Sequence, residues 1–410
     1  MKPCPWWVAL ATLAGLSAGP ASALATGVPG VRLDAALEAA WQRAVTAREA
    51  GGQAARAGAE RAAASSLWPL PPSLHASHRD DRLQSNVGQR ESELGVAIPL
   101  WLPGQRAARH AAAEASVAQA EAGRRVARLQ LAGELRDAAW TIVARQAEVE
   151  ESEAQAVFIA RLAEDVERRV RAGDLARADA LVVRAEHLAT TAQSAELRQR
   201  RQAARLRWAG LTGLDASPDT NGLAEPISPA ADIPADHPEL LHAVQSTDSA
   251  RRRLESLRQS RRDPPELSVG IRRDVDGRAE PSRSSLVVGV RIPFGSDGRY
   301  GPLEAAAESE LAVAQTSEQR VRDRLRIEHD TARSALSSVQ AQHDADAARA
   351  GLLRERAELI ERSFRAGETA LPELLRALAT ASQAESAASR QRAALGLARA
   401  RLQQALGVLP

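Results

Sequence analysis

The sequence predicts a mainly α-helical protein with a small β part, arranged as two similar halves. The duplication is indicated by segment 94–104, which recurs at 288–298 with a constant offset of 194 residues. The helical class is indicated by a stretch without proline between Pro103 and Pro218, in which apolar residues recur every three or four positions. Each half is therefore expected to fold in the same way. The matched pairs are Gly95 with Gly289, Val96 with Val290, Ile98 with Ile292, Pro99 with Pro293 and Gly104 with Gly298.

The N-terminal segment 1–25 is expected to be a secretory signal peptide. Lys2 precedes an apolar run at 6–16 that is too short to span a bilayer, and small residues suited to cleavage follow it. The single cysteine, Cys4, lies in this segment, so neither a disulfide nor a thiolate metal site is expected in the mature chain. The 54 basic and 52 acidic residues nearly balance, which argues against a nucleic-acid partner.

The first repeat is expected to cover residues 26–212. It begins with a helix at 31–66, which ends at the proline-rich segment 67–72 because proline has no amide hydrogen to donate. A β-hairpin is predicted at about 73–102, since apolar residues occupy every second position of its second strand. Those residues are Leu94, Val96, Ile98 and Leu100.

Two long antiparallel helices complete the first repeat. The first is predicted at about 105–170, and at about 1.5 Å per residue it would be roughly 100 Å long. It ends at the turn 171–174, where Gly173 can adopt the left-handed backbone that terminates a helix and Asp174 can cap the next one. The second helix returns to about residue 211, so the pair forms a helical hairpin.

A proline-rich linker at 213–238 leads into the second repeat, 239–410, which follows the same plan. Four strands in total are too few to close a barrel, since small closed barrels need about eight. The chain is therefore expected to form an oligomer in which each copy gives four strands to a shared barrel. The predicted elements of the second repeat are a helix at about 239–261, a β-hairpin at about 266–294, a long helix from near Pro302 to the turn 365–368, and a last helix ending near Leu406.

These features together resemble the TolC family of outer-membrane efflux proteins. The resemblance rests on the signal peptide, the two-fold repeat, the strand that ends in Gly-x-x-Ile-Pro and the paired Arg-Ala-Gly turns, and it covers almost the whole mature chain. It implies a homotrimer in the outer membrane, with a twelve-stranded β-barrel continued by a twelve-helix α-barrel in the periplasm. The partners it implies are a periplasmic adaptor, an inner-membrane pump and outer-membrane lipid. The pump class it favours is the RND type.

The resemblance also implies roles for particular positions. The turns 171–174 and 365–368 match the helical tips that close the tunnel and dock the adaptor. Glu373 matches an acidic residue that narrows the pore, and Asp179 is its counterpart in the first half; Arg376 departs from the family pattern, because a second acid is often found there. The tip residues are Arg171, Ala172, Gly173, Asp174, Arg365, Ala366, Gly367 and Glu368.

The junctions between barrel and tunnel are predicted where the period of two gives way to the helical period. Proline ends each strand there and glycine turns the chain into the long helix. The junction residues are Pro99, Gly104, Pro293 and Gly298.

Several polar features have plain structural explanations. His75 and His78 would point to opposite faces of a strand, which is poor geometry for a shared metal ion, so no metal site is predicted. The Arg-Ala-Gly turns would serve any helical hairpin, because glycine ends a helix and arginine offsets the dipole at its C-terminus. The sequence shows no phosphate loop, nucleophile elbow or His-Glu-x-x-His motif, so neither an enzyme nor a cofactor is expected.

Two other classes of protein also use long helical hairpins. A periplasmic adaptor normally has one hairpin and compact β domains, and a soluble periplasmic coiled-coil scaffold would leave the alternating strands unexplained. The sequence therefore predicts an outer-membrane channel of a tripartite efflux system, gated by its helical tips. Its substrate stays open between drugs, proteins and metal ions, with the compact halves favouring a heavy-metal subgroup.

Overall fold

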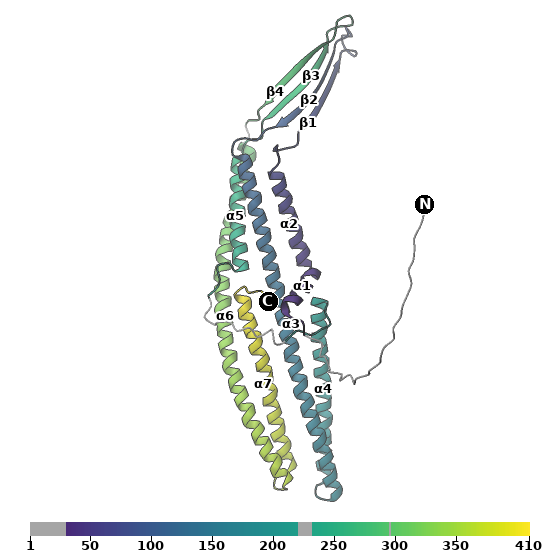
Figure 1. The fold of residues 1–410 in the computed structure, drawn as a ribbon, viewed down its shortest axis with the longest axis vertical. Helices are drawn as coiled ribbons and strands as arrows, with labels where there is room; N and C mark the ends of the chain where they lie inside the picture. Colours follow the sequence, from purple (N-terminus) through teal and green to yellow (C-terminus); the bar gives the residue numbers. More distant parts are fainter. Residues whose placement is uncertain (1–29, 220–231, 295–296) are drawn as a thin grey trace, which may run out of the picture.

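The computed structural model describes residues 30–219, 232–294 and 297–410, so the predicted signal peptide, 1–25, lies outside the described residues. The described chain is long and narrow, with a small sheet at one end and a stalk of long helices below it (Figure 1). The predicted class, mainly α with a small β part, is confirmed. No helix in the described ranges carries an apolar stretch long enough to cross a membrane.

The first helical segment differs from the prediction of one helix at 31–66. The structure contains α1 (Leu33–Arg43) and α2 (Val45–Ala64), separated by Ala44, whose ψ of 137° is extended. Both helices contact the long helix that follows, but only α1 contributes residues, among them Leu37, to the apolar core at the middle of the stalk. No glycine or proline near Ala44 indicates this break in the sequence.

The first helical hairpin consists of α3 (Gln105–Ala172) and α4 (Arg177–Thr212). Its core lies at the middle of the stalk, where the side chains of Leu135, Trp140 and Trp208 cluster with α1 and α7. Trp140 lies directly against Gly396, where a Cβ would come within 2.0 Å of the indole ring. The close approach of α3 to α7 at this level therefore depends on a glycine.

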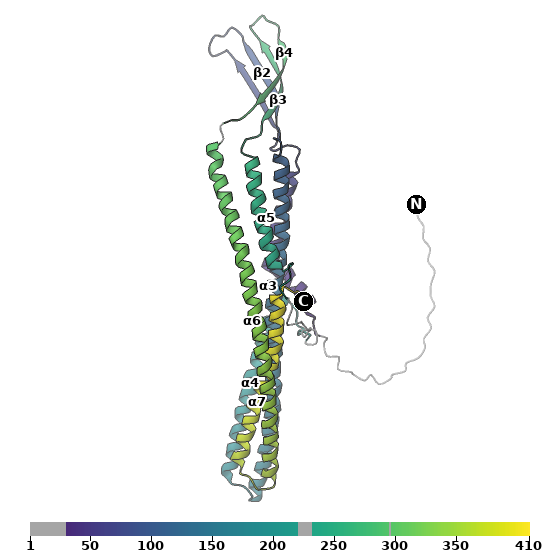
Figure 2. The ribbon, with the colours of Figure 1, turned by 90° about the vertical axis from the view of Figure 1, so that its left-hand side faces the viewer.

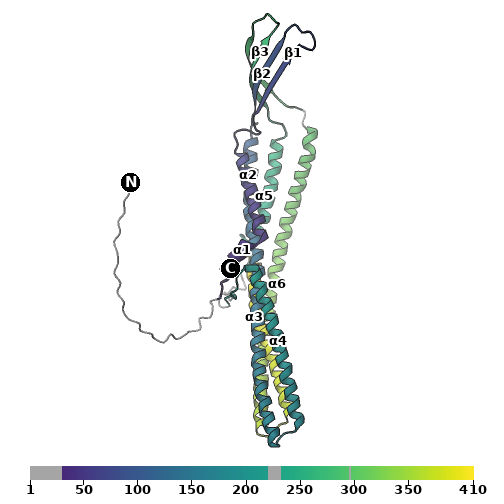
Figure 3. The same cartoon turned by 90° about the vertical axis from the view of Figure 1, so that its right-hand side faces the viewer.

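The second half contains α5 (Pro238–Gln259), α6 (Asp297–Arg365) and α7 (Leu371–Ala405). Helix α6 begins at Asp297, before Pro302, where its start was predicted, so this proline lies inside the helix and leaves one hydrogen bond of its second turn unmade. At the end near the sheet, α6 diverges from α5 and α3, whereas α6 and α7 stay together down to the tip (Figures 2 and 3).

The four strands form one antiparallel sheet in the order β1, β2, β3, β4. Strands β2 and β3 join the two halves, with Gly95 opposite Gly270 in their register. The predicted second strand of the second hairpin extended to Phe294, but β4 ends at Arg291 and Phe294 is almost fully exposed, so the alternation of apolar residues outlasts the strand pairing. The strands are β1 (Ser73–Asp80), β2 (Arg90–Pro99), β3 (Glu266–Val275) and β4 (Arg283–Arg291).

Candidate functional site

The two helical tips are closed by the same backbone arrangement. At the end of α3, Gly173 has φ 89°, and the amide of Asp174 donates to the carbonyl of Arg169 at 2.9 Å. At the end of α6, Gly367 has φ 81°, and the amide of Glu368 donates to the carbonyl of Ser363 at 3.0 Å. This is the Schellman pattern, which needs a residue with a left-handed backbone and so favours glycine. The repeated motif thus has a local structural cause at both turns.

All eight predicted tip residues are exposed at the end of the stalk opposite the sheet. Both tips carry the same charge pattern, an arginine followed three residues later by an acid: Arg171 and Asp174 at the first tip, Arg365 and Glu368 at the second. Arg365 forms an ion pair with Glu361 one turn back, and the carboxylate of Glu368 accepts from the Ser363 hydroxyl at 3.4 Å. The tips therefore offer two exposed polar surfaces of similar backbone and similar charge.

Just behind the tips, the two hairpins pack against each other. The guanidinium of Arg169 on α3 lies 5.1 Å from the centre of the Phe364 ring on α6, within cation–π range. An apolar cluster drawn from all four long helices surrounds this contact, so the two hairpins form one packed unit at this level. Its buried members are Leu162, Val166, Val183, Phe364, Leu371 and Leu374.

The predicted pore-constriction residues occupy equivalent positions, the third residues of α4 and α7. The Asp179 carboxylate accepts a hydrogen bond from the amide of Ala176 at 3.2 Å, which stabilises the start of α4. Glu373 is exposed at the start of α7, and Arg376 is exposed one turn further along. The structure thus gives Asp179 a capping role and leaves the Glu373 side chain open to solvent.

The two predicted junctions between sheet and stalk are not alike. Pro99 is the last residue of β2, and Gly104 caps α3 with φ 84°. Pro293 follows β4, but Gly298 already lies within the first turn of α6. The expectation that Gly298 turns the chain into the helix is therefore wrong, because the helix has begun one residue earlier and Gly298 has helical backbone.

The sheet has one apolar and one polar face, which we name the apolar sheet face and the polar sheet face. On the apolar face, cross-strand neighbours form continuous rows, and eight large side chains are between 40% and 72% exposed. These are Leu74, Leu94, Val96, Val269, Ile271, Leu286, Val288 and Val290.

The polar sheet face carries a charged cluster at its centre. Arg272 on β3 donates to Glu93 on β2 at 2.8 Å and pairs with Glu91 at 3.1 Å, and the His75 ring lies 3.4 Å from Glu93. His78 lies on the other face and contacts the Ser92 hydroxyl at 2.9 Å. The two histidines therefore have separate partners, and the described part of the chain brings together no group of three or more side chains suited to hold a metal ion.

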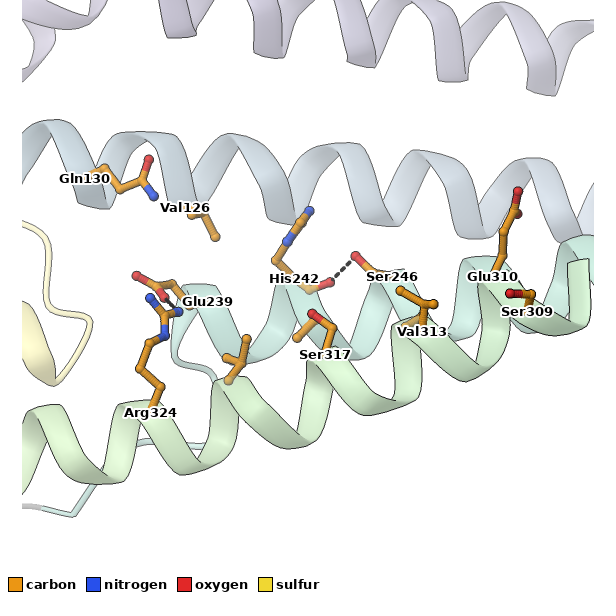
Figure 4. A pocket seen from close by; sticks show the side chains of 13 residues that line it. Val126, Gln130, Glu239, His242, Ser246, Ser309, Glu310, Val313, Ser317 and Arg324 are labelled. Atoms are coloured by element: carbon orange, nitrogen blue, oxygen red, sulfur yellow. Dashed lines mark hydrogen bonds and ion pairs between the residues drawn. The ribbon is translucent and has the colours of Figure 1, made fainter. Parts of the chain in front are cut away.

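A cavity of about 510 Å³ lies where α6 diverges from α3 and α5 (Figure 4). Arg324 of α6 pairs with Glu239 of α5 at one end, and His242 projects from α5 between the helices. Burial lowers the pKa of His242, so this residue is neutral near pH 7. The cavity has mixed apolar and polar walls and no arrangement of a nucleophile and a base.

A cluster of charged side chains that sequence reasoning missed lies between the hairpins. Glu151 on α3 and Glu385 on α7 line the same pocket, and Glu385 pairs with Arg354 on α6. These residues are not related by the repeat, and each lies within a long helical pattern that gives no sign of the others. Only the packing of α3 on α7 brings the two carboxyl groups together.

Comparisons with known proteins agree with this geometry. The cobalt-zinc-cadmium resistance protein CzcC of Cupriavidus metallidurans is 28% identical over 213 residues, which cover 50% of this chain and 50% of that protein. The chain thus matches about half the length of this curated relative. No family model matches the chain.

Solved structures match nearly the whole chain. The outer-membrane protein VceC of Vibrio cholerae has a TM-score of 0.73 at 15% identity, covering 92% of this chain and 96% of that one. The transmembrane channel CusC has a TM-score of 0.76 at 16% identity, covering 97% and 99%. The Campylobacter jejuni CmeC outer-membrane channel has a TM-score of 0.71 at 13% identity, covering 92% and 85%. The chain therefore has the fold of the single chains of these outer-membrane channels.

Proposed function

We propose that this protein is the outer-membrane channel of a tripartite efflux system and acts as a homotrimer. The observation that carries the proposal is the apolar sheet face, which lies uncovered at one end of a long helical stalk. Large apolar patches on a surface normally mark a partner or a membrane. The likeness in fold to solved outer-membrane channels supports the membrane as that environment.

The edges of the sheet support the trimer. Strands β1 and β4 each pair on one side only, so each leaves a row of backbone groups without a partner in the sheet. In a bilayer such groups must be satisfied by other strands, because lipid offers no hydrogen bonds. Three copies would join their sheets edge to edge into one cylinder of twelve strands, with the apolar sheet face toward outer-membrane lipid and the polar sheet face toward the lumen.

The stalk would then extend into the periplasm and end at the tips. We propose that the exposed turns 171–174 and 365–368 dock a periplasmic adaptor and that Glu373 and Asp179 line the narrowest part of the closed pore. Opening would be a rigid-body movement of the helical hairpins. This function is transport, in which the chain catalyses no reaction and uses no cofactor.

For the substrate, we propose divalent metal cations, delivered by an inner-membrane pump of the RND type. The support is the similarity to a protein named for cobalt, zinc and cadmium resistance. A polar lumen would let hydrated cations pass without a binding site of their own, so the pump would select the ion. Drugs are the alternative substrate class.

Membrane fractionation tests the channel against its rivals. We expect the full chain in the outer-membrane fraction, running as a trimer after cross-linking in mild detergent. A periplasmic adaptor would fractionate with the inner membrane, and a coiled-coil scaffold would be released with the soluble periplasm. Either of these results would overturn the proposal.

Growth on metal salts tests the substrate. We expect deletion of the gene to lower the zinc, cobalt or cadmium concentration that stops growth, and the wild-type gene on a plasmid to restore it. The control is a set of drugs exported by other tripartite systems. Sensitivity to those drugs with unchanged metal tolerance would replace metal ions by drugs as the substrate and leave the channel function intact.

A further inference from the structure

A pocket of about 330 Å³ lies between the two helical hairpins, in the lower half of the stalk. Two carboxyl groups face each other in it across the α3–α7 contact, since the side chains of Glu151 and Glu385 both line this pocket. Glu385 also forms an ion pair with Arg354 of α6. The three residues thus bring polar groups of α3, α7 and α6 together in one pocket.

The charges around Glu151 are unbalanced. The pocket is lined by Glu186 from α4, Glu358 and Glu361 from α6, and Glu385 from α7, and its lining includes a single arginine, Arg354. Glu361 pairs with Arg365 outside the pocket. With every carboxyl group ionised, the interface between the hairpins would hold more negative than positive charge at short range.

The α3–α7 contact is the main connection between the two hairpins. Above the carboxyl pair, Arg136 of α3 donates to Gln404 of α7 at 2.6 Å. Directly below it, the Ser382 hydroxyl donates to the Gln155 side chain at 2.6 Å, and the apolar cluster around Phe364 follows toward the tips. The carboxyl pair therefore lies between two contacts that hold the hairpins together. Repulsion between the two carboxylates at this point would push the hairpins apart.

We propose that Glu151 and Glu385 form a proton-controlled latch between the hairpins, closed when the Glu151 carboxyl is protonated and loosened when it ionises. In the closed state the Glu151 carboxyl donates a hydrogen bond to the Glu385 carboxylate, which Arg354 holds in place. When Glu151 loses its proton to solvent, that hydrogen bond is lost and two carboxylates face each other.

The pH at which the latch works follows from its surroundings. Burial, followed by the neighbouring Glu385 carboxylate, raises the pKa of Glu151 from 4.5 to about 7. Because the packed state binds this proton more tightly than the separated state, packing is most stable below about pH 4.5 and loses this contribution as the pH rises through 7. The transition thus falls where modest changes in pH alter the population of the closed state.

Hydrogen–deuterium exchange on the full-length protein tests the latch without any assumption about transport. After correction for intrinsic rates, we expect the amides of 145–160 and 378–392 to lose about tenfold in protection between pH 5.5 and 8.5, a value reduced for the partial exposure of Glu151. Glu151→Gln keeps a neutral hydrogen-bond donor and should remain protected at both pH values. The matched control is Glu150→Gln, since Glu150 is exposed and accepts only from Gln146 on its own helix; it should behave like the wild type.

Protection that does not change with pH in the wild type would overturn the latch, as would an unchanged pH dependence in Glu151→Gln. If the protein is the channel proposed above, separation of the hairpins should open its pore. This step rests on the proposed function, and conductance in planar bilayers distinguishes the latch from the channel function. We expect conductance to rise from pH 5.5 to 8.5 in the wild type and to be independent of pH in Glu151→Gln. Failure to conduct at any pH, with the exchange transition intact, would reject the channel and leave the latch standing.

Discussion

The tip end of the stalk and the sheet lie at opposite ends of the molecule, and they treat their large apolar residues differently. Behind the tips, six large side chains from all four long helices are buried in one cluster. On the apolar sheet face, eight are exposed in the single chain. A helical hairpin can bury its apolar stripe against another hairpin of the same chain, whereas a single-layer sheet has nothing to cover its face. The comparison teaches that the apolar side chains of the sheet must be covered by something outside the chain, whereas the stalk buries most of its own.

The largest effect is expected from removing a buried aromatic residue of the stalk. Trp208 is 1% exposed, and its indole donates to the carbonyl of Ala216 at 3.1 Å. Trp208→Ala should lower the free energy of unfolding by about 3–5 kcal/mol, through the cavity and the lost contacts. Urea denaturation followed by circular dichroism measures this. On the sheet, Leu286→Ala should change the same quantity by less than about 1 kcal/mol in detergent; an equal loss at both sites would contradict the comparison.

The next effect concerns the surroundings of the sheet. Val288→Arg places a charge in the middle of the apolar sheet face and should cost about 2–4 kcal/mol on insertion into a bilayer. Refolding into lipid vesicles, measured as the fraction inserted against urea, should show this loss. The control is Ser285→Arg, because Ser285 lies on the polar sheet face opposite Arg272. If both variants insert equally well, the apolar sheet face does not contact lipid.

A smaller effect is expected at the tips, where the backbone conformation, and not side-chain packing, restricts which residues can occupy the turn. Gly173→Ala and Gly367→Ala force a side chain onto left-handed backbone and should each destabilise the protein by about 1–2 kcal/mol. The matched control is Gly51→Ala, which lies in α2 with open space around it and should stabilise by about 0.5–1 kcal/mol. Thermal melting of the three variants distinguishes them. Stabilisation by the tip substitutions would show that these turns have another conformation.

The smallest effect extends the comparison to histidines: His75 and His78 on the sheet are half-buried or exposed, whereas His237 of the stalk is buried. His237 is 1% exposed, and its Nδ1 accepts from the amide of Glu239 at the start of α5. Burial lowers the pKa of His237, so the unfolded chain binds this proton more readily and the contribution to stability is lost as the pH falls below 6.5. His237→Asn keeps an acceptor that does not titrate. The urea midpoint of unfolding of His237→Asn, relative to that of the wild type, should be higher at pH 5.5 than at pH 8. A relative midpoint that does not change with pH would contradict this role of His237.

The sequence was most informative where local chemistry decides the structure. The period of alternation indicated β2, and the stretch without proline before the turn at Gly173 indicated α3 within two residues of its end. The sequence was least informative where the local residue pattern suits either of two conformations, such as a continuous or a broken helix. Nothing near Ala44 indicates the break between α1 and α2, and the alternation that continues to Phe294 gives no sign that pairing stops at Arg291.

The sequence by itself determined the duplication, the order of elements, the two glycine-closed tips and the apolar face of the sheet. These follow from periodicity and from residues with restricted backbones, which act within a few positions along the chain. Only the tertiary structure decided that Glu151 meets Glu385, that Arg169 lies on Phe364 and that Trp140 packs on Gly396. Those pairs lie far apart in the chain and are not related by the repeat. They depend on the rotation and height at which α3 meets α6 and α7, which a helical period alone does not fix.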